Sequence, residues 1–179
     1  THAEAFSKLV VQDYKGRMKP VHTLSRELMR KIYRKESYNN LSADQVLLSM
    51  YANPQDWYGE KLIKLGKHEE LLKVLGVKGS YASYKDFFDT SGAYKLRDEV
   101  KRVYDLNPKD QGVYEKELLK IDERLNILNM MFSGGLLKII PVTNDTNNTW
   151  ISNHSHGNGH DSQLASNFFN AYALALKKG

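Results

Sequence analysis

The chain of 179 residues contains no cysteine, four prolines and no long hydrophobic run. Without cysteine there is no disulfide, no thiol nucleophile and no CxxCH motif. The absence of disulfides is compatible with either redox compartment, because a chain of this length can bury a core of ordinary size. No apolar run approaches the roughly 18 residues that span a bilayer, and no signal peptide is visible. The chain begins at Thr1, and we interpret it as a piece excised from a longer protein.

Signatures of the common enzyme classes are also missing. There is no P-loop, nucleophile elbow or dinucleotide-binding fingerprint. The acidic pairs Glu69-Glu70 and Asp98-Glu99 are sequence neighbours on predicted helices, and such neighbours do not face each other. No nucleic-acid recognition fingerprint occurs either. We therefore expect the isolated chain to have no catalytic activity of its own and no nucleic-acid partner.

The composition is that of a globular protein, with 41% hydrophobic and 26% charged residues and a formal net charge of +5. Basic residues are spread along the chain, with small clusters at 15–19 and 30–35. We interpret these clusters as solvated helix faces. The alternative is a basic surface for an acidic partner or for lipid headgroups.

Apolar spacing and capping signals predict a mostly helical chain. Residues Phe6 to Gln12 form a short apolar run that favours a strand. Pro20 suits the first turn of a helix, and the apolar residues that follow it recur at helical spacing. Ser42 precedes Gln45 by three residues, which is a capping box. A third start is expected at Asn53-Pro54.

The longest predicted helix begins at Asn107-Pro108 and ends at Gly134-Gly135. Its apolar residues repeat in alternating steps of four and three, as in a coiled-coil seam; they are Tyr114, Leu118, Ile121, Leu125, Leu128 and Phe132. Candidate strands are few beside six or seven helices. The sequence therefore predicts one compact domain over residues 1–179, mainly α with a small β-sheet, in the α+β class.

Residues 143–162 are polar and rich in asparagine and glycine, and we expect a long surface loop there. His154, His156 and His160 lie within this loop, and imidazoles are good ligands for Zn, Cu, Ni and haem iron. One interpretation is a metal site formed by these three residues. The other is that a His-containing tract of low complexity binds metal adventitiously or not at all.

Two further residues are candidates for binding. His22 lies in the first turn of a predicted helix, close to Arg17 and Lys19, and it is either a ligand or propionate-side contact of haem or a polar residue near a helix start. Trp57 is followed by Tyr58. It either stacks on a porphyrin or a peptide, or anchors the core.

Several short segments of the chain resemble a known family. They are Val11-Gln12, Gly16-Arg17-Met18-Lys19-Pro20-Val21-His22-Thr23-Leu24, Glu27 to Ile32, Leu41 to Leu48, Asn53-Pro54, Trp57-Tyr58 and Leu62 to Leu65. The resemblance is to the extracytoplasmic (periplasmic) domain of fused System II cytochrome c biogenesis proteins of the CcsB/CcsA or ResB/ResC type, in a Bacteroides-like form. It is dense over residues 8–65 and weaker beyond them.

This resemblance implies a protein of the inner membrane that delivers haem and joins it to apocytochrome c. The chain would be a docking or structural platform on the periplasmic side, and membrane-embedded segments absent from it would carry the haem chemistry. Arg17, Lys19, His22 and Trp57 are then the candidate haem or partner contacts. Two alternatives stay open: an extracytoplasmic protein-interaction module that uses the long helix or the basic clusters, and a metal-binding protein built on the histidine loop.

Overall fold

The computed structural model describes residues 1–13, 15–152, 163–164, 166–168, 170–171 and 174. Within this part of the chain, seven α-helices and two 3₁₀ helices accompany eight short strands, which pair two by two in antiparallel fashion. The prediction of a mainly α, α+β fold is confirmed. Residue contacts divide the chain into two units, which we describe separately. The prediction of a single domain over residues 1–179 stays a prediction.

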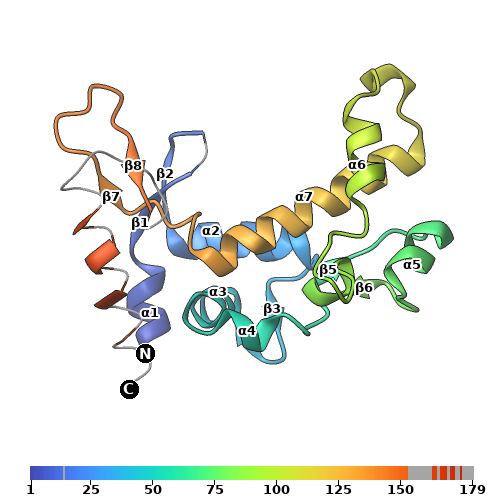
Figure 1. The fold of residues 1–179 in the computed structure, drawn as a ribbon. Helices are drawn as coiled ribbons and strands as arrows, with labels where there is room; N and C mark the ends of the chain where they lie inside the picture. The colour runs from blue at the N-terminus through green and yellow to red at the C-terminus, as the bar shows by residue number, and fades with distance from the viewer. Residues whose placement is uncertain (14, 153–162, 165, 169, 172–173, 175–179) are drawn as a thin grey trace. The chain divides into compact units, whose positions relative to one another are not determined.

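Unit 1 comprises residues 1–30, 35–54 and 129–179. Its elements are α1 (His2–Ser7), β1 (Val10–Gln12), β2 (Met18–Pro20), most of α2 (Val21–Ile32), β3 (Ser37–Tyr38), β4 (Leu41–Ser42), α3 (Ala43–Ala52), β7 (Ile140–Pro141) and β8 (Trp150–Ile151). Within the unit, α1 packs against α3. Figure 1 shows β1, β2, β7 and β8 gathered at the same end of this unit.

The N-terminal segment differs from the prediction of one strand over Phe6 to Gln12. Residues His2–Ser7 form α1, capped by a box between Thr1 and Glu4, and the strand begins only at Val10. Phe6 is 3% exposed and belongs to the buried face of the helix. One apolar run therefore serves a helix and a strand in succession, because α1 ends at its C-cap Lys8, inside this run.

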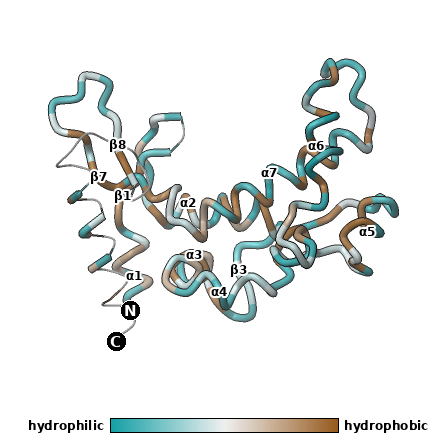
Figure 2. Tube along the Cα trace, in the orientation of Figure 1, coloured by the Kyte–Doolittle hydropathy of each residue, from teal (hydrophilic) through white to brown (hydrophobic). Residues whose placement is uncertain are grey.

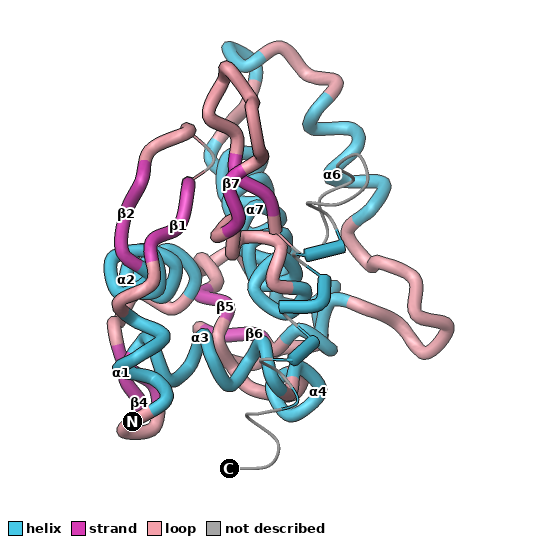
Figure 3. Tube along the Cα trace, turned by 90° about the vertical axis from the view of Figure 1, so that its left-hand side faces the viewer, coloured by secondary structure: helices cyan, strands magenta, loops and turns pink. Residues whose placement is uncertain are grey.

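Two hairpins of unit 1 depend on residues with positive φ. Gly16 has a φ of 78° in the turn between β1 and β2, and Asn39 and Asn40 have φ of 46° and 66° between β3 and β4. Both central residues of a two-residue hairpin turn of this kind need positive φ, which asparagine tolerates well. Pro20 differs from its predicted place inside the helix, since it pairs with Val10 as the last residue of β2. Figure 3 shows β1 and β2 as one hairpin that leads into α2.

The apolar face of α2 agrees with the predicted spacing, since Val21, Leu24, Leu28 and Ile32 are all buried. The capping box at Ser42 and Gln45 is also present and starts α3. β7 occupies only Ile140–Pro141 of the apolar run from Leu136 to Val142. Its partner β8 lies inside the stretch predicted as loop. In Figure 2 the connection between β7 and β8 is hydrophilic, whereas both strands contain hydrophobic residues.

Unit 2 comprises residues 31–34 and 55–128. Its elements are the end of α4 (Pro54–Trp57), β5 (Ile63–Lys64), α5 (Glu69–Leu75), β6 (Tyr81–Ala82), the 3₁₀ helix Tyr84–Phe87, α6 (Arg97–Tyr104), the 3₁₀ helix Pro108–Asp110, and α7 (Val113–Ser133) up to residue 128. Gly76 ends α5 with a φ of 70°, a left-handed conformation that glycine adopts at no steric cost. The predicted long helix begins later than expected, because Gln111 and Gly112 separate the first 3₁₀ turn from α7.

The predicted seam of α7 is part of the core. Leu118, Ile121 and Leu128 are 0% exposed. Two polar residues share the buried side of this helix: Asp122 is 6% exposed and Arg124 is 3% exposed. Asp122 accepts hydrogen bonds from the hydroxyl of Tyr94 at 2.8 Å and the amide of Asn126 at 3.0 Å. Polar contacts therefore stabilise the core of unit 2 in addition to apolar packing.

Candidate functional site

The turn between β1 and β2 holds Arg17 and Lys19 around one buried carboxylate, that of Asp13. Its Oδ1 accepts the backbone N–H groups of Lys15 at 2.8 Å and Arg17 at 2.9 Å. Its Oδ2 lies 3.2 Å from Nη2 of Arg17 and 3.1 Å from Nζ of Lys19. The backbone N–H of Arg17, followed by the ammonium of Lys19, holds the pKa of Asp13 well below its usual range.

The two basic residues of this turn differ in accessibility. Lys19 is 12% exposed and also lies 2.7 Å from Oε2 of Glu27, and this carboxylate raises the pKa of the lysine. Its charge is therefore already balanced by two acidic groups. Arg17 has a side chain that is 67% exposed. Of the pair, Arg17 presents its cation to solvent and to any anionic ligand, whereas Lys19 stabilises the hairpin.

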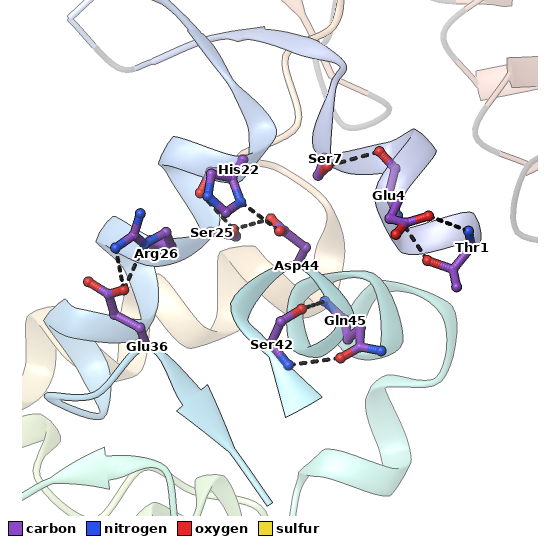
Figure 4. A network of polar contacts seen from close by, with 10 residues as sticks. All are labelled: Thr1, Glu4, Ser7, His22, Ser25, Arg26, Glu36, Ser42, Asp44 and Gln45. Atoms are coloured by element: carbon purple, nitrogen blue, oxygen red, sulfur yellow. Dashed lines mark hydrogen bonds and ion pairs between the residues drawn. The ribbon is translucent and has the colours of Figure 1, made fainter. Parts of the chain in front are cut away.

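His22 is the centre of a second polar group in unit 1, shown in Figure 4. Its Nδ1 donates to Oδ2 of Asp44 at 2.7 Å, since an ionised carboxylate can only accept. The other carboxylate oxygen, Oδ1, accepts the hydroxyl of Ser25 at 2.5 Å. Asp44 itself is 8% exposed. The buried carboxylate therefore joins the first turns of α2 and α3.

Local structure explains why these three residues meet. His22 and Ser25 are three positions apart on α2 and thus share a side of the helix. Asp44 lies in the first turn of α3, immediately after the cap at Ser42, where the helix dipole favours a negative charge. Sequence reasoning missed Ser25 and Asp44. The available signal was the capping box, which places Asp44 at a helix start.

The imidazole of His22 is anchored on one side and open on the other. Its side chain is 53% exposed, and in Figure 4 the second ring nitrogen points away from Asp44. With Nδ1 bonded to Asp44, Nε2 is the ring nitrogen left to contact a ligand. A histidine fixed in this way by a carboxylate is typical of metal ligands in proteins.

Beside this group, Arg26 forms an ion pair with Glu36, with Nη2 to Oε2 at 2.5 Å. Arg30 reaches the other oxygen of the same carboxylate at 3.1 Å. Part of the positive charge of the 30–35 cluster is thus neutralised within the unit. This arrangement supports the interpretation of that cluster as a solvated, internally paired helix face.

Trp57 lies in unit 2, at the end of α4, and is 6% exposed. Its burial supports the interpretation as a core anchor over that of a stacking surface. A row of less buried rings follows it, with centroids 5.2 Å apart for Tyr58 and Tyr84, 5.0 Å for Tyr84 and Phe88, and 6.0 Å for Phe88 and Tyr94. Two of these rings, Tyr84 and Phe88, belong to the aromatic-rich segment from Tyr81 to Phe88.

The other candidate ligands, His154, His156 and His160, lie outside the described residues. Among the residues that are described, no group of three or more histidine, aspartate or glutamate side chains is placed to hold a metal ion. None of the described helices combines the length and the apolar character that a bilayer crossing requires. The roles of Arg17, Lys19, His22 and Trp57 in binding stay predictions.

No protein-family model matches this sequence. The chain is similar to Protein NrfI of Wolinella succinogenes. The two are 43% identical over 151 residues, which is 84% of this chain and 17% of the relative. The chain thus spans about a sixth of the length of the curated relative it matches.

This finding corrects the family resemblance drawn from the N-terminal motif. The relative is Protein NrfI from Wolinella, not a protein of a Bacteroides-like bacterium, and the assignment to a fused System II protein of the CcsB/CcsA or ResB/ResC type is not supported. In the structure, Arg17 and Lys19 of this motif surround the carboxylate of Asp13, and His22 lies in the first turn of α2.

Proposed function

We propose that this chain is part of a protein of cytochrome c maturation and takes part in the attachment of haem. The observation that carries the proposal is the 43% identity to Protein NrfI over 84% of the chain. At this identity the two segments share a fold, and we infer that the matched 151 residues have a common use in both proteins. The chain would work on the periplasmic side of the inner membrane, as part of a larger protein.

Within this process the chain acts as a platform for apocytochrome c or haem. The absence of cysteine means that the chain supplies no thiol, so the thiols that receive haem come from the apocytochrome. Haem would be the cofactor handled by the whole protein. On this chain, the exposed guanidinium of Arg17 and the imidazole of His22 are the groups with the right chemistry for a propionate and for iron.

A binding experiment without haem tests the proposal. A fluorescent peptide that contains a CxxCH motif is titrated with the 179-residue chain, and anisotropy is followed under reducing conditions. We expect saturable binding in the micromolar range, and weaker binding of a matched peptide with alanine at both cysteines. If both peptides bind equally or neither binds, the chain is not a platform for apocytochrome.

The interaction-module alternative loses its main structural support. It relied on an exposed face of the long helix or on the basic clusters, and Leu118, Ile121 and Leu128 of the helix seam are fully buried. The half-buried rings from Tyr58 to Tyr94 are of the residue types that are enriched in protein contacts. The alternative of a metal site in the histidine loop depends on residues outside the described part of the chain.

A further inference from the structure

The loop between β7 and β8 in unit 1 is an exposed feature to which the proposed function assigns no role. All residues from 143 to 149 are exposed except Asp145, which is half-buried, and Figure 1 shows the loop extending beyond the ends of both strands. Its base is fixed, because the side chain of Gln12 in β1 bonds to the backbone of Asn148 and Trp150. The unit therefore presents this loop to solvent from an anchored hairpin.

The loop contains an acceptor sequence for an N-linked glycan. An asparagine followed two positions later by serine or threonine is the signal for attachment of an oligosaccharide to the side-chain amide. The chain contains four such triplets, which begin at Asn40, Asn144, Asn147 and Asn153. Bacterial oligosaccharyltransferases also require an acidic residue two positions before the asparagine. Of the four, only Asn147 meets this requirement, through Asp145.

We propose that Asn147 is a site of N-linked glycosylation. The inference rests on the proposed function only for the periplasmic side of the membrane, where such transferases act. The co-substrate is an oligosaccharide carried on a polyprenyl diphosphate. Nδ2 of Asn147 forms a bond to the anomeric carbon of the first sugar, and the bond from that carbon to the diphosphate oxygen breaks. The polyprenyl diphosphate leaves with the electron pair, and the amide gives up a proton to a base.

The side chain of Asn147 has the accessibility that this transfer needs. The residue is exposed. Within the part of the chain that the structure describes, its backbone N–H donates to Oδ1 of Asp145 at 3.1 Å, whereas its side-chain amide makes no hydrogen bond. A glycan on Nδ2 would therefore extend into solvent without displacing a packed group, as expected for a bulky surface modification.

Two other acceptor triplets lie in the described residues, and the fold disfavours both. Asn40 has a φ of 66° in the turn before β4. The hydroxyl of Ser42, the second recognition group of its triplet, already accepts the N–H of Gln45 as the cap of α3. Asn144 has a φ of 59° and follows Val142, not an acidic residue, at the required position. Exposure and the acidic residue thus coincide at Asn147.

Asp145 also shapes the loop itself. Besides the N–H of Asn147, its carboxylate accepts the N–H of Thr149 at 2.9 Å, a local contact typical of aspartate in turns. A transferase that recognises the carboxylate has to open these contacts, and an exposed loop opens at low cost. Asp145→Asn keeps an oxygen acceptor for the turn but removes the charge. This substitution therefore separates recognition by a transferase from folding of the loop.

The test exports the 179-residue chain to the periplasm of a bacterial host that contains a bacterial oligosaccharyltransferase and its lipid-linked oligosaccharide. The purified chain is analysed by mass spectrometry, with fragmentation of the peptide that follows Lys138. We expect one glycan per chain, attached at Asn147, and the same modification on this peptide of the native protein. Asn147→Gln should abolish it, whereas the matched control Asn144→Gln should be modified as the parent is. The host without the transferase gives the unmodified mass.

Variants of Asp145 test the recognition step. Asp145→Asn should lower the glycosylated fraction at early times about tenfold, because a charge-assisted contact to the transferase is lost. Asp145→Glu should retain the modification. The circular dichroism spectrum and Tm of both variants should match those of the parent, which shows that the loop has not unfolded the unit.

Several outcomes would overturn the inference. They are an unmodified parent chain, an unmodified native peptide, a glycan at another asparagine, and a glycosylated fraction that is the same in Asp145→Asn. None of them bears on the proposed function, because the titration with the CxxCH peptide uses the unmodified chain. The two ideas therefore fail separately.

Discussion

Gln12 and Trp150 are joined by a hydrogen bond across 138 residues of sequence, since Oε1 of Gln12 accepts the backbone N–H of Trp150 at 2.8 Å. The amide nitrogen of the same side chain donates to the carbonyl oxygen of Asn148 at 2.8 Å. Gln12 is 7% exposed. One buried amide therefore attaches the β7–β8 hairpin to strand β1 within unit 1.

Replacing Gln12 with leucine should destabilise unit 1 by about 2 kcal/mol, because the N–H of Trp150 and the carbonyl oxygen of Asn148 would lose their part-buried hydrogen bonds to this side chain. The free energy of unfolding in urea is the measurement, with tryptophan fluorescence as a probe of the hairpin around Trp150. Gln55→Leu is the control, since Gln55 is exposed and its change should cost less than about 0.5 kcal/mol. Equal effects of the two variants would contradict this account of Gln12.

Arg124 is a buried residue that stabilises unit 2 through polar contacts. Its Nη1 donates to the carbonyl oxygen of Lys64 at 2.5 Å and lies 3.4 Å from Oε1 of Glu117. Arg124→Met keeps the length of the side chain but leaves a carbonyl and a carboxylate without their donor. We expect a loss of about 3 kcal/mol in the free energy of unfolding. The exposed Arg97→Met serves as control and should change it by less than about 0.5 kcal/mol.

Gly66 lies against the side chain of Glu117. A Cβ added at this glycine would lie 2.7 Å from Cγ of Glu117, so the glutamate would have to move away from Arg124. Gly66→Ala should therefore cost about 1–2 kcal/mol. Gly79→Ala is a matched control, because nothing lies within 4 Å of the added Cβ. A thermal shift of equal size in both variants would exclude steric conflict as the cause.

The carboxylate of Asp13 should make stability depend on acid pH. Its pKa in the folded state is lowered, so its stabilising contribution is present above the unfolded-state pKa of about 4 and is lost as the pH falls below that value. The stability difference between the parent and Asp13→Asn should thus be largest near neutral pH and shrink between about pH 4 and pH 2. Three other carboxylates also have lowered pKa values, namely those of Asp86, Asp89 and Asp145. They titrate in both the parent and the variant, so their contributions cancel in the stability difference. A difference that does not vary with pH would contradict this prediction.

Substitutions in the seam of α7 test whether this seam is part of the core or an interaction surface. Ile121 is 0% exposed, so Ile121→Asp places a charge in an apolar core, and we expect loss of the cooperative unfolding transition. The neighbouring Lys120→Asp changes an exposed position and should leave the transition in place. A folded Ile121→Asp variant with altered self-association would revive the interface interpretation.

Local signals predicted much of this fold. The capping box at Ser42 and Gln45 and the apolar spacing of α2 both appear in the structure where the sequence placed them. These features depend on residues within one or two turns of each other, and their energies are local. The same locality explains the success of the mainly α assignment.

Strand pairing and the polar group around His22 depended on distant residues. β8 was missed because Trp150 and Ile151 stand in a polar stretch and become a strand only by pairing with Pro141 and Ile140. Asp44 acquires its role only when α2 and α3 pack, which brings it to a histidine 22 residues earlier. The sequence by itself determined the helical character of α2, α3 and most of α7, but not that of α1, which lies in a run predicted as a strand. Tertiary structure alone decided that Lys19 is enclosed between two carboxylates, Trp57 is buried and His22 is held by Asp44, because burial and long-range hydrogen bonds exist only after the elements have packed.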